Sequence, residues 1–404
     1  MKNKFKRIKS IFSLILVVFV ANSCIEEFNA TTESFDSILI IEAVLTDELK
    51  SHQVKLSKTF RFEEDGPAAE KNAIVKIIDN LSNEYQFNET DDGIYTSVNE
   101  FAAQLGETYI LQIQTASGVN YSSSPQVLIP SSEIEDVYPL AEVNDDGIDG
   151  IGVYVDTFDP NDDAKYYRFS YEETHQIIAP RWNPNKAVVI TEEPPIIDIV
   201  NKTEEDKICY TTEESIDINV TSTDALSDNK LTKFKVRFII SDDYRIKNRY
   251  SINVKKNVLS REAFSFYKQI NEFSGSQSLF SQVQPGFVSG NVISENSNEK
   301  VLGLFEVSSV TSKRIFFNYK ELTGEVSKAK YPVSCFFVAP EDPYDVVTMI
   351  KNNIVSWVTD EPLPCTDEFC PYGEIEGGPN VYVNRACGDC TVLGSNIVPE
   401  FWEN

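Results

Sequence analysis

Six cysteines follow Cys24 and carry the most varied chemistry of this 404-residue sequence. Thiols can form disulfides, bind zinc or exchange electrons, and an even count in an exported chain favours disulfides. The last four read C-x4-C, sixteen residues, then C-x2-C, a spacing also compatible with a four-thiolate zinc site. We expect disulfides, with the last four paired among themselves and the first two paired together. The six are Cys209, Cys335, Cys365, Cys370, Cys387 and Cys390.

The segment Cys387-Gly388-Asp389-Cys390 also has the spacing of a redox-active dithiol. Such a pair normally stands at the start of a helix, whose N-terminus lowers the thiol pKa. The residues that follow, Thr391–Asn396, make a poor helix start. A structural role for this pair is therefore favoured over electron transfer.

Hydrolytic chemistry has little support, because the chain has only two histidines, His52 and His175. A Ser-His-Asp triad would need one of them. We expect His52 to face solvent from an alternating strand and His175 to lie at a strand edge. The sequence contains no G-x-S-x-G elbow, H-E-x-x-H motif or phosphate-binding glycine loop. We therefore predict a protein that is not an enzyme.

One acidic segment offers oxygen ligands to a hard cation. Residues 144–150 read N-D-D-G-I-D-G, which sets Asp145 and Asp149 around a turn-forming glycine. Ca²⁺ takes such oxygens, although the distal glutamate of an EF-hand loop is missing. The favoured interpretation is an Asp/Gly hairpin turn, with a Ca²⁺ site as the alternative and otherwise no cofactor.

The N-terminus has the pattern of an export signal. Residues 2–9 carry five Lys and Arg, residues 11–20 form a short apolar run, and Ala21-Asn22-Ser23 precede Cys24. The apolar run is too short for a comfortable membrane span. The thiol resembles that of a bacterial lipobox, although Ala21 replaces the usual leucine. We predict a signal peptide at 1–23 and lipidation of Cys24, which anchors the mature chain to a membrane.

Acidic residues dominate the rest of the chain. Glu26 and Glu27 resemble the short acidic signal that directs lipoproteins of the Bacteroidota to the cell surface. Removing residues 1–23 removes five cations and no acid, which leaves 31 Lys and Arg against 63 Asp and Glu, a net charge of −32. Such a field repels nucleic acid, so we exclude a nucleic-acid partner. We predict a lipid-anchored outer-membrane protein that is exposed on the cell surface.

The elements that carry these residues are expected to be mainly strands, since Val, Ile, Thr, Tyr and Phe recur in short runs. Residues 24–36 are polar and form an acidic tether. Residues 37–130 contain short alternating runs separated by turn residues. We predict an immunoglobulin-like β-sandwich for that segment.

A larger β-rich domain with a few helices is predicted for residues 131–358. Its clearest helix lies near 260–274, where Ser260 can cap an apolar stripe at helical spacing. Residues 180–207 are rich in Pro and Glu, and we expect a long excursion without regular structure there. Residues 359–404 form a Cys-rich C-terminal segment.

Three parts of the sequence together resemble one known family. They are the acidic start that leads into a strand, the middle segments 285–293 and 301–308, and an end that combines Cys387–Cys390 with residues 394–402. This pattern is similar to the Bacteroidota surface lipoproteins of the domain of unknown function 4249 family, over nearly the whole mature chain. The resemblance implies a gene that lies beside that of a TonB-dependent outer-membrane receptor. It implies no catalytic or ligand-binding residue.

We therefore expect an accessory capture subunit or lid of a TonB-dependent transporter. Aromatic residues in long loops, such as Trp182 and Tyr344, are candidate contacts. A structural, adhesion or envelope-assembly lipoprotein without a small ligand is the alternative, and an extracellular enzyme is a second one.

Overall fold

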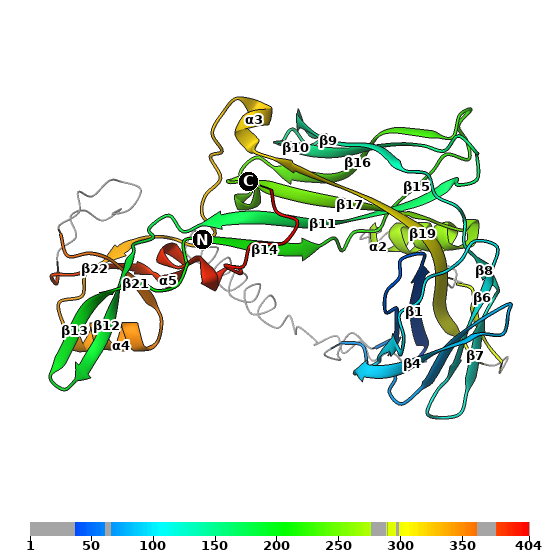
Figure 1. Cartoon of the computed structure of the whole chain (residues 1–404), viewed down its shortest axis with the longest axis horizontal. Helices are drawn as coiled ribbons and strands as arrows, with labels where there is room; N and C mark the ends of the chain where they lie inside the picture. The colour runs from blue at the N-terminus through cyan, green and yellow to red at the C-terminus, as the bar shows by residue number, and fades with distance from the viewer. Residues whose placement is uncertain are drawn as a thin grey trace, which may run out of the picture.

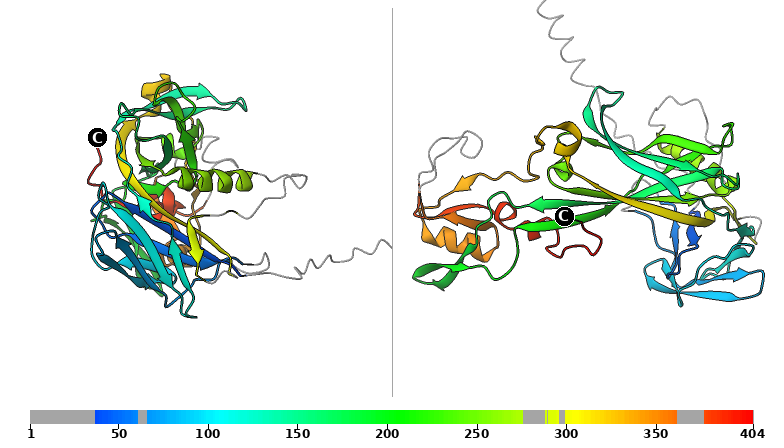
Figure 2. Two further views of the ribbon diagram at one scale, coloured as in Figure 1. Left: turned by 90° about the vertical axis from the view of Figure 1, so that its right-hand side faces the viewer. Right: turned by 45° about the horizontal axis from the view of Figure 1, so that its top comes forward.

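The computed structural model describes residues 37–60, 66–275, 288, 290–295, 299–361 and 377–403. These residues form three modules along one long axis (Figure 1). At one end lies the module that begins at residue 37, which we call the sandwich module after its predicted fold; a central module follows, and a distal module lies at the other end. Figure 2 gives two further views of the same arrangement. The described part of the protein is mainly β with few helices, which confirms the predicted class at that level. No helix in these ranges is both long and apolar enough to cross a membrane.

The sandwich module is built from short strands whose side chains alternate between core and surface. In β1 (Leu39–Thr46), Ile41, Ala43 and Leu45 all point into one core, as the two-residue period of a strand requires. The strands follow the order β1-β2-β5-β4-β3-β6-β7, with β8 beside β6. The others are β2 (Gln53–Lys58), β3 (Ile74–Asp79), β4 (Glu84–Asp91), β5 (Ile94–Ser97), β6 (Thr108–Gln114), β7 (Asn120–Ser123) and β8 (Gln126–Val127).

Two strands from much later in the chain complete this module. β18 (Val292–Ser294) pairs with β7, and the first part of β19 (Val301–Phe317) runs parallel to β1. The amide side chain of Asn291 links them, because it donates to the Phe305 carbonyl and accepts from the Phe305 N–H, both at 2.7 Å. The sandwich expected over residues 37–130 is therefore incomplete without these later strands.

The central module packs two sheets around a second core. The antiparallel sheet β9-β10-β16 lies over β11, β14, β15, β17 and the second part of β19. Tyr167, Phe169 and Tyr171 of β11 fill the space between the sheets. The elements are β9 (Ile134–Val143), β10 (Asp149–Phe158), β11 (Tyr166–Ile178), β14 (Ile208–Glu214), β15 (Asn219–Ser222), β16 (Lys230–Ile240), η1 (Tyr244–Ile246), β17 (Tyr250–Val258), α2 (Arg261–Gly275) and α3 (Tyr319–Thr323).

Helix α2 confirms the helix that the sequence predicts near residue 260. The hydroxyl of Ser260 accepts from the Ala263 N–H at 3.1 Å and so caps the first turn. Ala263 then packs against Leu259 and Leu304, which fixes the helix over the place where the sandwich and central modules meet.

Strand β19 belongs to both modules. Residues 301–308 pair with β1 of the sandwich, and residues 309–317 pair antiparallel with β17 of the central module. One continuous backbone therefore carries hydrogen bonds from one core to the next.

A fully buried carboxylate, Glu306, lies at that crossing. It accepts hydrogen bonds from Arg168 at 2.9 Å, from Tyr267 at 2.7 Å and from Ser308 at 2.6 Å. Burial alone would raise the pKa of Glu306. The Arg168 charge and these hydrogen bonds lower the pKa by more than burial raises it, so the pKa lies below its ordinary value. Glu306 is thus ionised and paired inside the junction.

The distal module joins segments that are far apart in the sequence. The hairpin β12–β13 forms within residues 180–207, so the expectation of an irregular excursion there is wrong. Its apolar side chains, Ile197 and Ile199 among them, belong to the cluster formed with α4 and β21. β21 pairs with β22, so the boundary expected at residue 359 runs through a sheet. The elements are β12 (Asn185–Glu192), β13 (Pro195–Asn201), β20 (Phe337–Val338), α4 (Pro343–Lys351), β21 (Val355–Thr359), β22 (Val381–Asn384), α5 (Arg385–Gly388) and η2 (Cys390–Val392).

Candidate ligand-binding site

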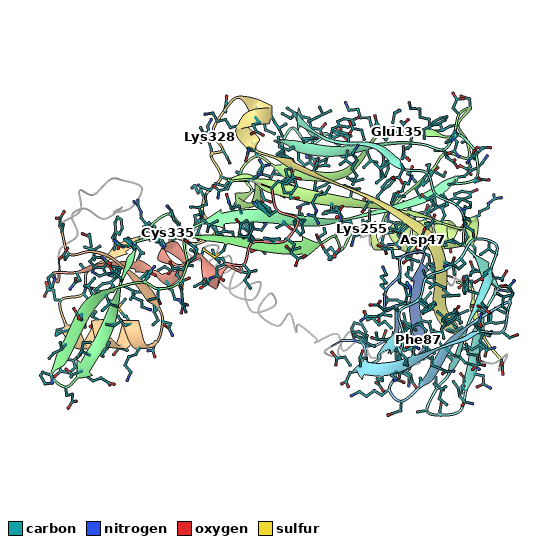
Figure 3. The ribbon with its side chains drawn as sticks, viewed as in Figure 1. Asp47, Phe87, Glu135, Lys255, Lys328 and Cys335 are labelled. Atoms are coloured by element: carbon teal, nitrogen blue, oxygen red, sulfur yellow. A yellow bond between two sulfur atoms is a disulfide. The ribbon has the colours of Figure 1, made fainter. Side chains whose placement is uncertain are left out.

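Two disulfides between described residues hold the distal module. Cys335–Cys387 closes the module on itself, and Cys209–Cys390 ties η2 to β14 of the central module. Figure 3 labels Cys335 near the junction of the two modules. The predicted pairing of Cys209 with Cys335 is wrong, and so is the pairing of Cys387 and Cys390 within the last four cysteines; a link between Cys365 and Cys370 stays a prediction, because both lie outside the described residues. The reason is that β14 lies beside η2 in space, and cysteine spacing carries no information about that contact.

A pocket of about 230 Å³ lies in the distal module close to these disulfides. Strands β12, β21 and β22 line it together with the end of α4 and the α5–η2 segment. Ala187, Ile350 and Trp357 give it an apolar wall, and the module's small core continues behind that wall. A pocket of this size suits a small molecule or one group of a larger one.

Two ion pairs form the polar side of the pocket. Lys202 Nζ lies 2.6 Å from the Asp206 carboxylate and donates to the Gly388 carbonyl at 3.0 Å. Arg385 Nε donates to the Asp389 carboxylate at 2.9 Å, and its Nη2 lies 2.9 Å from the same oxygen. Burial raises the pKa of Asp389, but hydrogen bonds from its neighbours and the Arg385 charge lower it to below its usual value. Asp389 therefore stays ionised and orients the guanidinium.

The side chains of four lining residues, Tyr382, Lys186, Glu204 and Asn353, have no hydrogen bond or ion pair with a described residue. Burial raises the pKa of Tyr382 to about 12, so its buried, unpartnered hydroxyl remains protonated and able to donate. Lys186 and Glu204 are exposed lining residues without an ion pair among the described residues. The pocket therefore has hydrogen-bonding capacity that the described chain does not use.

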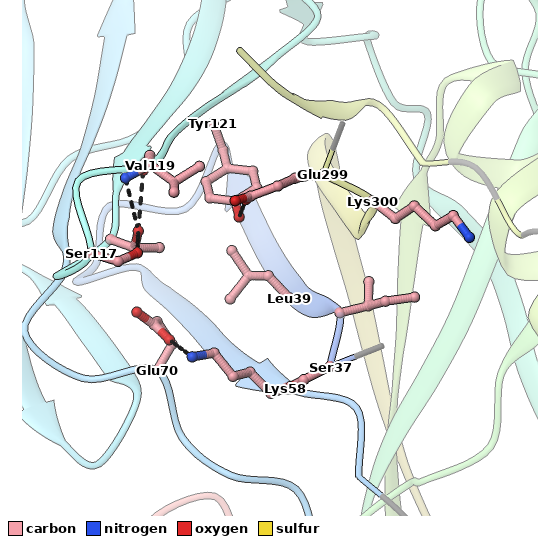
Figure 4. Close-up of a pocket in the computed structure, with 11 residues that line it drawn as sticks. Ser37, Leu39, Lys58, Glu70, Ser117, Val119, Tyr121, Glu299 and Lys300 are labelled. Atoms are coloured by element: carbon pink, nitrogen blue, oxygen red, sulfur yellow. Dashed lines mark hydrogen bonds and ion pairs between the residues drawn. The ribbon is translucent and has the colours of Figure 1, made fainter. Parts of the chain in front are cut away.

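A second pocket, of about 380 Å³, lies in the sandwich module (Figure 4). Its wall includes Ser37, the first described residue, and the Lys58–Glu70 ion pair at 2.6 Å. The Tyr121 hydroxyl donates to Glu299 at 2.8 Å. Most polar groups here are already paired with one another, so we take the distal pocket as the candidate site.

The two histidines lie elsewhere, and both predictions about their positions are wrong. His52 is buried: it precedes β2, shares the inward face of Val54, and its Nε2 lies 2.9 Å from the Phe101 carbonyl. His175 is fully buried on β11, which is paired on both sides by β14 and β17 and is no edge. Burial lowers the pKa of His175 to about 4. Neither residue lines either pocket.

The acidic segment 144–150 forms the turn between β9 and β10. The Asn144 side chain accepts from the backbone N–H groups of Asp146 at 3.0 Å and Ile148 at 2.8 Å, which is an Asx-type turn. Asp145 and Asp149 lie on this turn, and within the described ranges no third acid, His or Cys joins them as a metal-binding group. The Ca²⁺ alternative therefore stays a prediction.

The remaining predicted residues lie either outside the described ranges or in the distal module. Cys24, Glu26, Glu27, Cys365 and Cys370 lie outside the described residues. Of the aromatic candidates, Trp182 donates its indole N–H to Asp206 at 2.6 Å, next to the pocket, whereas Tyr344 lies exposed on α4 and does not line it.

Sequence analysis missed Lys186, Lys202, Tyr382 and Arg385 as site residues. They come from three separate segments, and only the fold brings them together. The one usable signal is that Arg385 stands two residues before Cys387, where a disulfide can fix the backbone around it.

The fold and the pocket define a class of elongated, three-module β proteins with a disulfide-braced polar pocket at one end. Within that class, residues 25–314 match the model of the Domain of unknown function (DUF4249), and the chain belongs to this family. The match does not include residues 359–404, which the sequence resemblance had counted as part of the pattern.

Two further comparisons add little. No curated protein matches the chain. The crystal structure of a DUF4785 family protein from Legionella pneumophila subsp. pneumophila str. Philadelphia 1 is similar over 54% of this chain and 51% of that chain, with 11% sequence identity and a TM-score of 0.17. The chain thus spans about half the length of that protein, and a TM-score this low carries no argument about fold.

Proposed function

We propose that this protein is a surface-exposed outer-membrane lipoprotein that serves as an accessory capture subunit or lid of a TonB-dependent transporter, and that it binds without catalysing a reaction. The observation that carries the proposal is the order of the modules. Residue 37, which follows the proposed tether, begins the sandwich module, and the candidate pocket lies in the module at the opposite end of the molecule (Figure 1). A chain anchored at Cys24 would hold its sandwich near the membrane and carry the pocket farther out.

Two other features support export. The cystines Cys209–Cys390 and Cys335–Cys387 are of the kind that persists in an oxidising compartment. The leader with five cations and the apolar run in front of Cys24 is the pattern of an export signal. The family resemblance adds the expectation of a receptor partner.

The anchor is tested by mass spectrometry of the N-terminal peptide from the membrane fraction. We expect a diacylated Cys24, and loss of membrane attachment in Cys24→Ala. Protease added to intact cells should digest the protein, whereas the variant Glu26→Gln/Glu27→Gln should keep the lipid and become protected. An unmodified thiol would contradict the anchor, and protection of the wild type would contradict surface display.

The transporter partnership is tested by isolating tagged, full-length protein in mild detergent. We expect an outer-membrane β-barrel receptor to co-purify from wild-type cells and to be absent from the Cys24→Ala preparation. A correctly lipidated protein that brings down no receptor would instead support the structural or adhesion alternative.

A further inference from the structure

We propose that the distal pocket binds a small anion, a carboxylate or phosphate group carried on a compact apolar body. This inference deepens the proposed capture role and depends on it for its biological purpose. The binding itself is a property of the isolated chain, so it can be tested without the receptor.

Two half-buried acids of the pocket, Asp206 and Asp389, are already paired with cations of the pocket. Asp206 accepts from Lys202 and from the Trp182 indole N–H. Asp389 accepts from Arg385 on one oxygen, and the Thr391 N–H at 2.9 Å donates to the other. The negative charge of each carboxylate is therefore already balanced by a cation next to it.

The basic side chains of the pocket, in contrast, have N–H groups that no described residue accepts from. A guanidinium has five N–H groups, and Arg385, whose side chain is 38% exposed, directs only its Nε and Nη2 toward Asp389. An ammonium has three, and Lys202 uses two, on Asp206 and the Gly388 carbonyl. The ammonium of Lys186, an exposed lining residue, has no partner among the described residues.

The pocket therefore has more unused hydrogen-bond donors than unused acceptors, and most of these donors belong to charged groups. A ligand that satisfies it must bring acceptor oxygens, and charge-assisted hydrogen bonds to a carboxylate or phosphate are the strongest that such donors can make. The unpaired acid among the lining residues is Glu204, which is exposed and opposes an anion. Lys186 and Glu204 should therefore affect affinity in opposite directions.

The apolar wall limits what the anion can be attached to. Ile350, Ala187 and Trp357 line the pocket, and the volume of about 230 Å³ has room for a ring or a short alkyl chain next to the charged group. The body of the protein carries a net charge of −27 in the full sequence, which repels anions at long range. Specific binding here must therefore come from the local donors.

The experiment is calorimetric titration of the purified full-length protein with phenylacetate, phenyl phosphate, inorganic phosphate and the neutral isostere phenylacetamide. We expect an aryl anion to bind with a Kd below about 1 mM and phenylacetamide to bind at least about tenfold more weakly, which corresponds to roughly 1.4 kcal/mol. The comparison of phenylacetate with phenyl phosphate separates a carboxylate site from a phosphate site. Inorganic phosphate measures how much the apolar wall contributes.

Three variants test the location. Lys186→Gln should weaken binding of the aryl anion by roughly fivefold and Glu204→Gln should tighten it by roughly twofold, as expected for exposed charges. Lys328→Gln, on an 89% exposed lysine that does not line the pocket, should leave the Kd unchanged (Figure 3). The proposal is overturned if neither aryl anion binds, if the amide binds as well as the anions, or if Lys186→Gln and Lys328→Gln have the same effect. None of these outcomes affects the receptor test.

Discussion

The core of the sandwich module draws side chains from β1 to β7 and from the late strands β18 and β19, whereas the distal module's core cluster has three buried side chains, Val346, Trp357 and Tyr382. The sandwich meets the central module through the shared strand β19 and the buried Glu306 pair. The distal module meets the central module through a small apolar cluster that includes Ile177 of β11, and through the Cys209–Cys390 disulfide from β14. One junction is non-covalent and the other is reinforced covalently.

This difference follows from size. A small module cannot bury enough apolar surface to offset the conformational entropy lost on folding, and disulfides lower that loss by constraining the unfolded chain. The pocket lies in the module that depends on such links, which suits a site whose walls come from three distant segments. A covalent brace keeps these walls in register without a large core.

The largest expected effect comes from removing the disulfides. In the chain-entropy model, a link across 181 residues contributes about 5 kcal/mol and one across 52 residues about 4 kcal/mol. We expect Cys209→Ala/Cys390→Ala to raise hydrogen–deuterium exchange throughout β12, β13 and β21. The strands of the sandwich should keep their protection.

The matched variant Cys335→Ala/Cys387→Ala opens the link inside the module and should give the same pattern with a smaller effect. If β3 and β6 lost protection as much as β21 in either variant, the two modules would not differ in the way described.

A structural feature can be predicted from the sequence when the residues that specify it lie close together in the chain. The two-residue period of residues 39–45 and the capped stripe of α2 are local, and both elements form as expected. The return of residues 291–308 to the sandwich is not local. It depends on Gly303, where a Cβ would lie 3.0 Å from Val292 Cβ, and on the side chain of Asn291 bonding to Phe305. A sequence shows such residues without showing what they contact.

The same limit applies to buried polar residues. We expect His52 to face solvent and His175 to lie at a strand edge, although each stands an even number of residues from an inward-facing neighbour, Val54 and Phe169 respectively. Periodicity was the better guide in both cases. The pocket could not be found in this way, because its donors share neither a strand nor a spacing.

The second prediction concerns the non-covalent junction. Glu306→Gln removes the counter-charge of Arg168, whose side chain is 20% exposed. Leaving one partner of a buried pair unpaired typically costs about 3 to 5 kcal/mol, so we expect a loss of about 4 kcal/mol in the free energy of unfolding. The measurement is urea denaturation followed by exchange in β1 and β17.

Glu192→Gln serves as the control, because it breaks a pair of similar length, 2.7 Å to Lys351, between exposed side chains of the distal module. Its cost should stay below about 1 kcal/mol. Equal costs for the two variants would mean that the sandwich–central junction does not depend on its buried charge pair.

The third prediction separates the modules by pH, through His175 in the central core. Its pKa is about 4 in the folded protein, mainly because of burial and secondly because of the Arg245 charge, against 6.5 for an ordinary histidine. Between these values the unfolded chain binds a proton that the folded chain does not. The stability of the central module should therefore fall as pH falls from about 6.5 to about 4, by roughly 3 kcal/mol in total.

His175→Phe should abolish this slope and leave stability above pH 7 unchanged or higher, because neither ring nitrogen has a hydrogen-bond partner among the described residues. The distal module has no buried histidine among its described residues, and the lowered pKa of Asp389 acts mainly near and below the ordinary value of 3.8, so exchange in this module should show a much smaller slope over the same range. A slope that persists in His175→Phe would assign the acid sensitivity to carboxylates instead, and a slope shared by β21 would mean that the distal and central modules unfold as one unit.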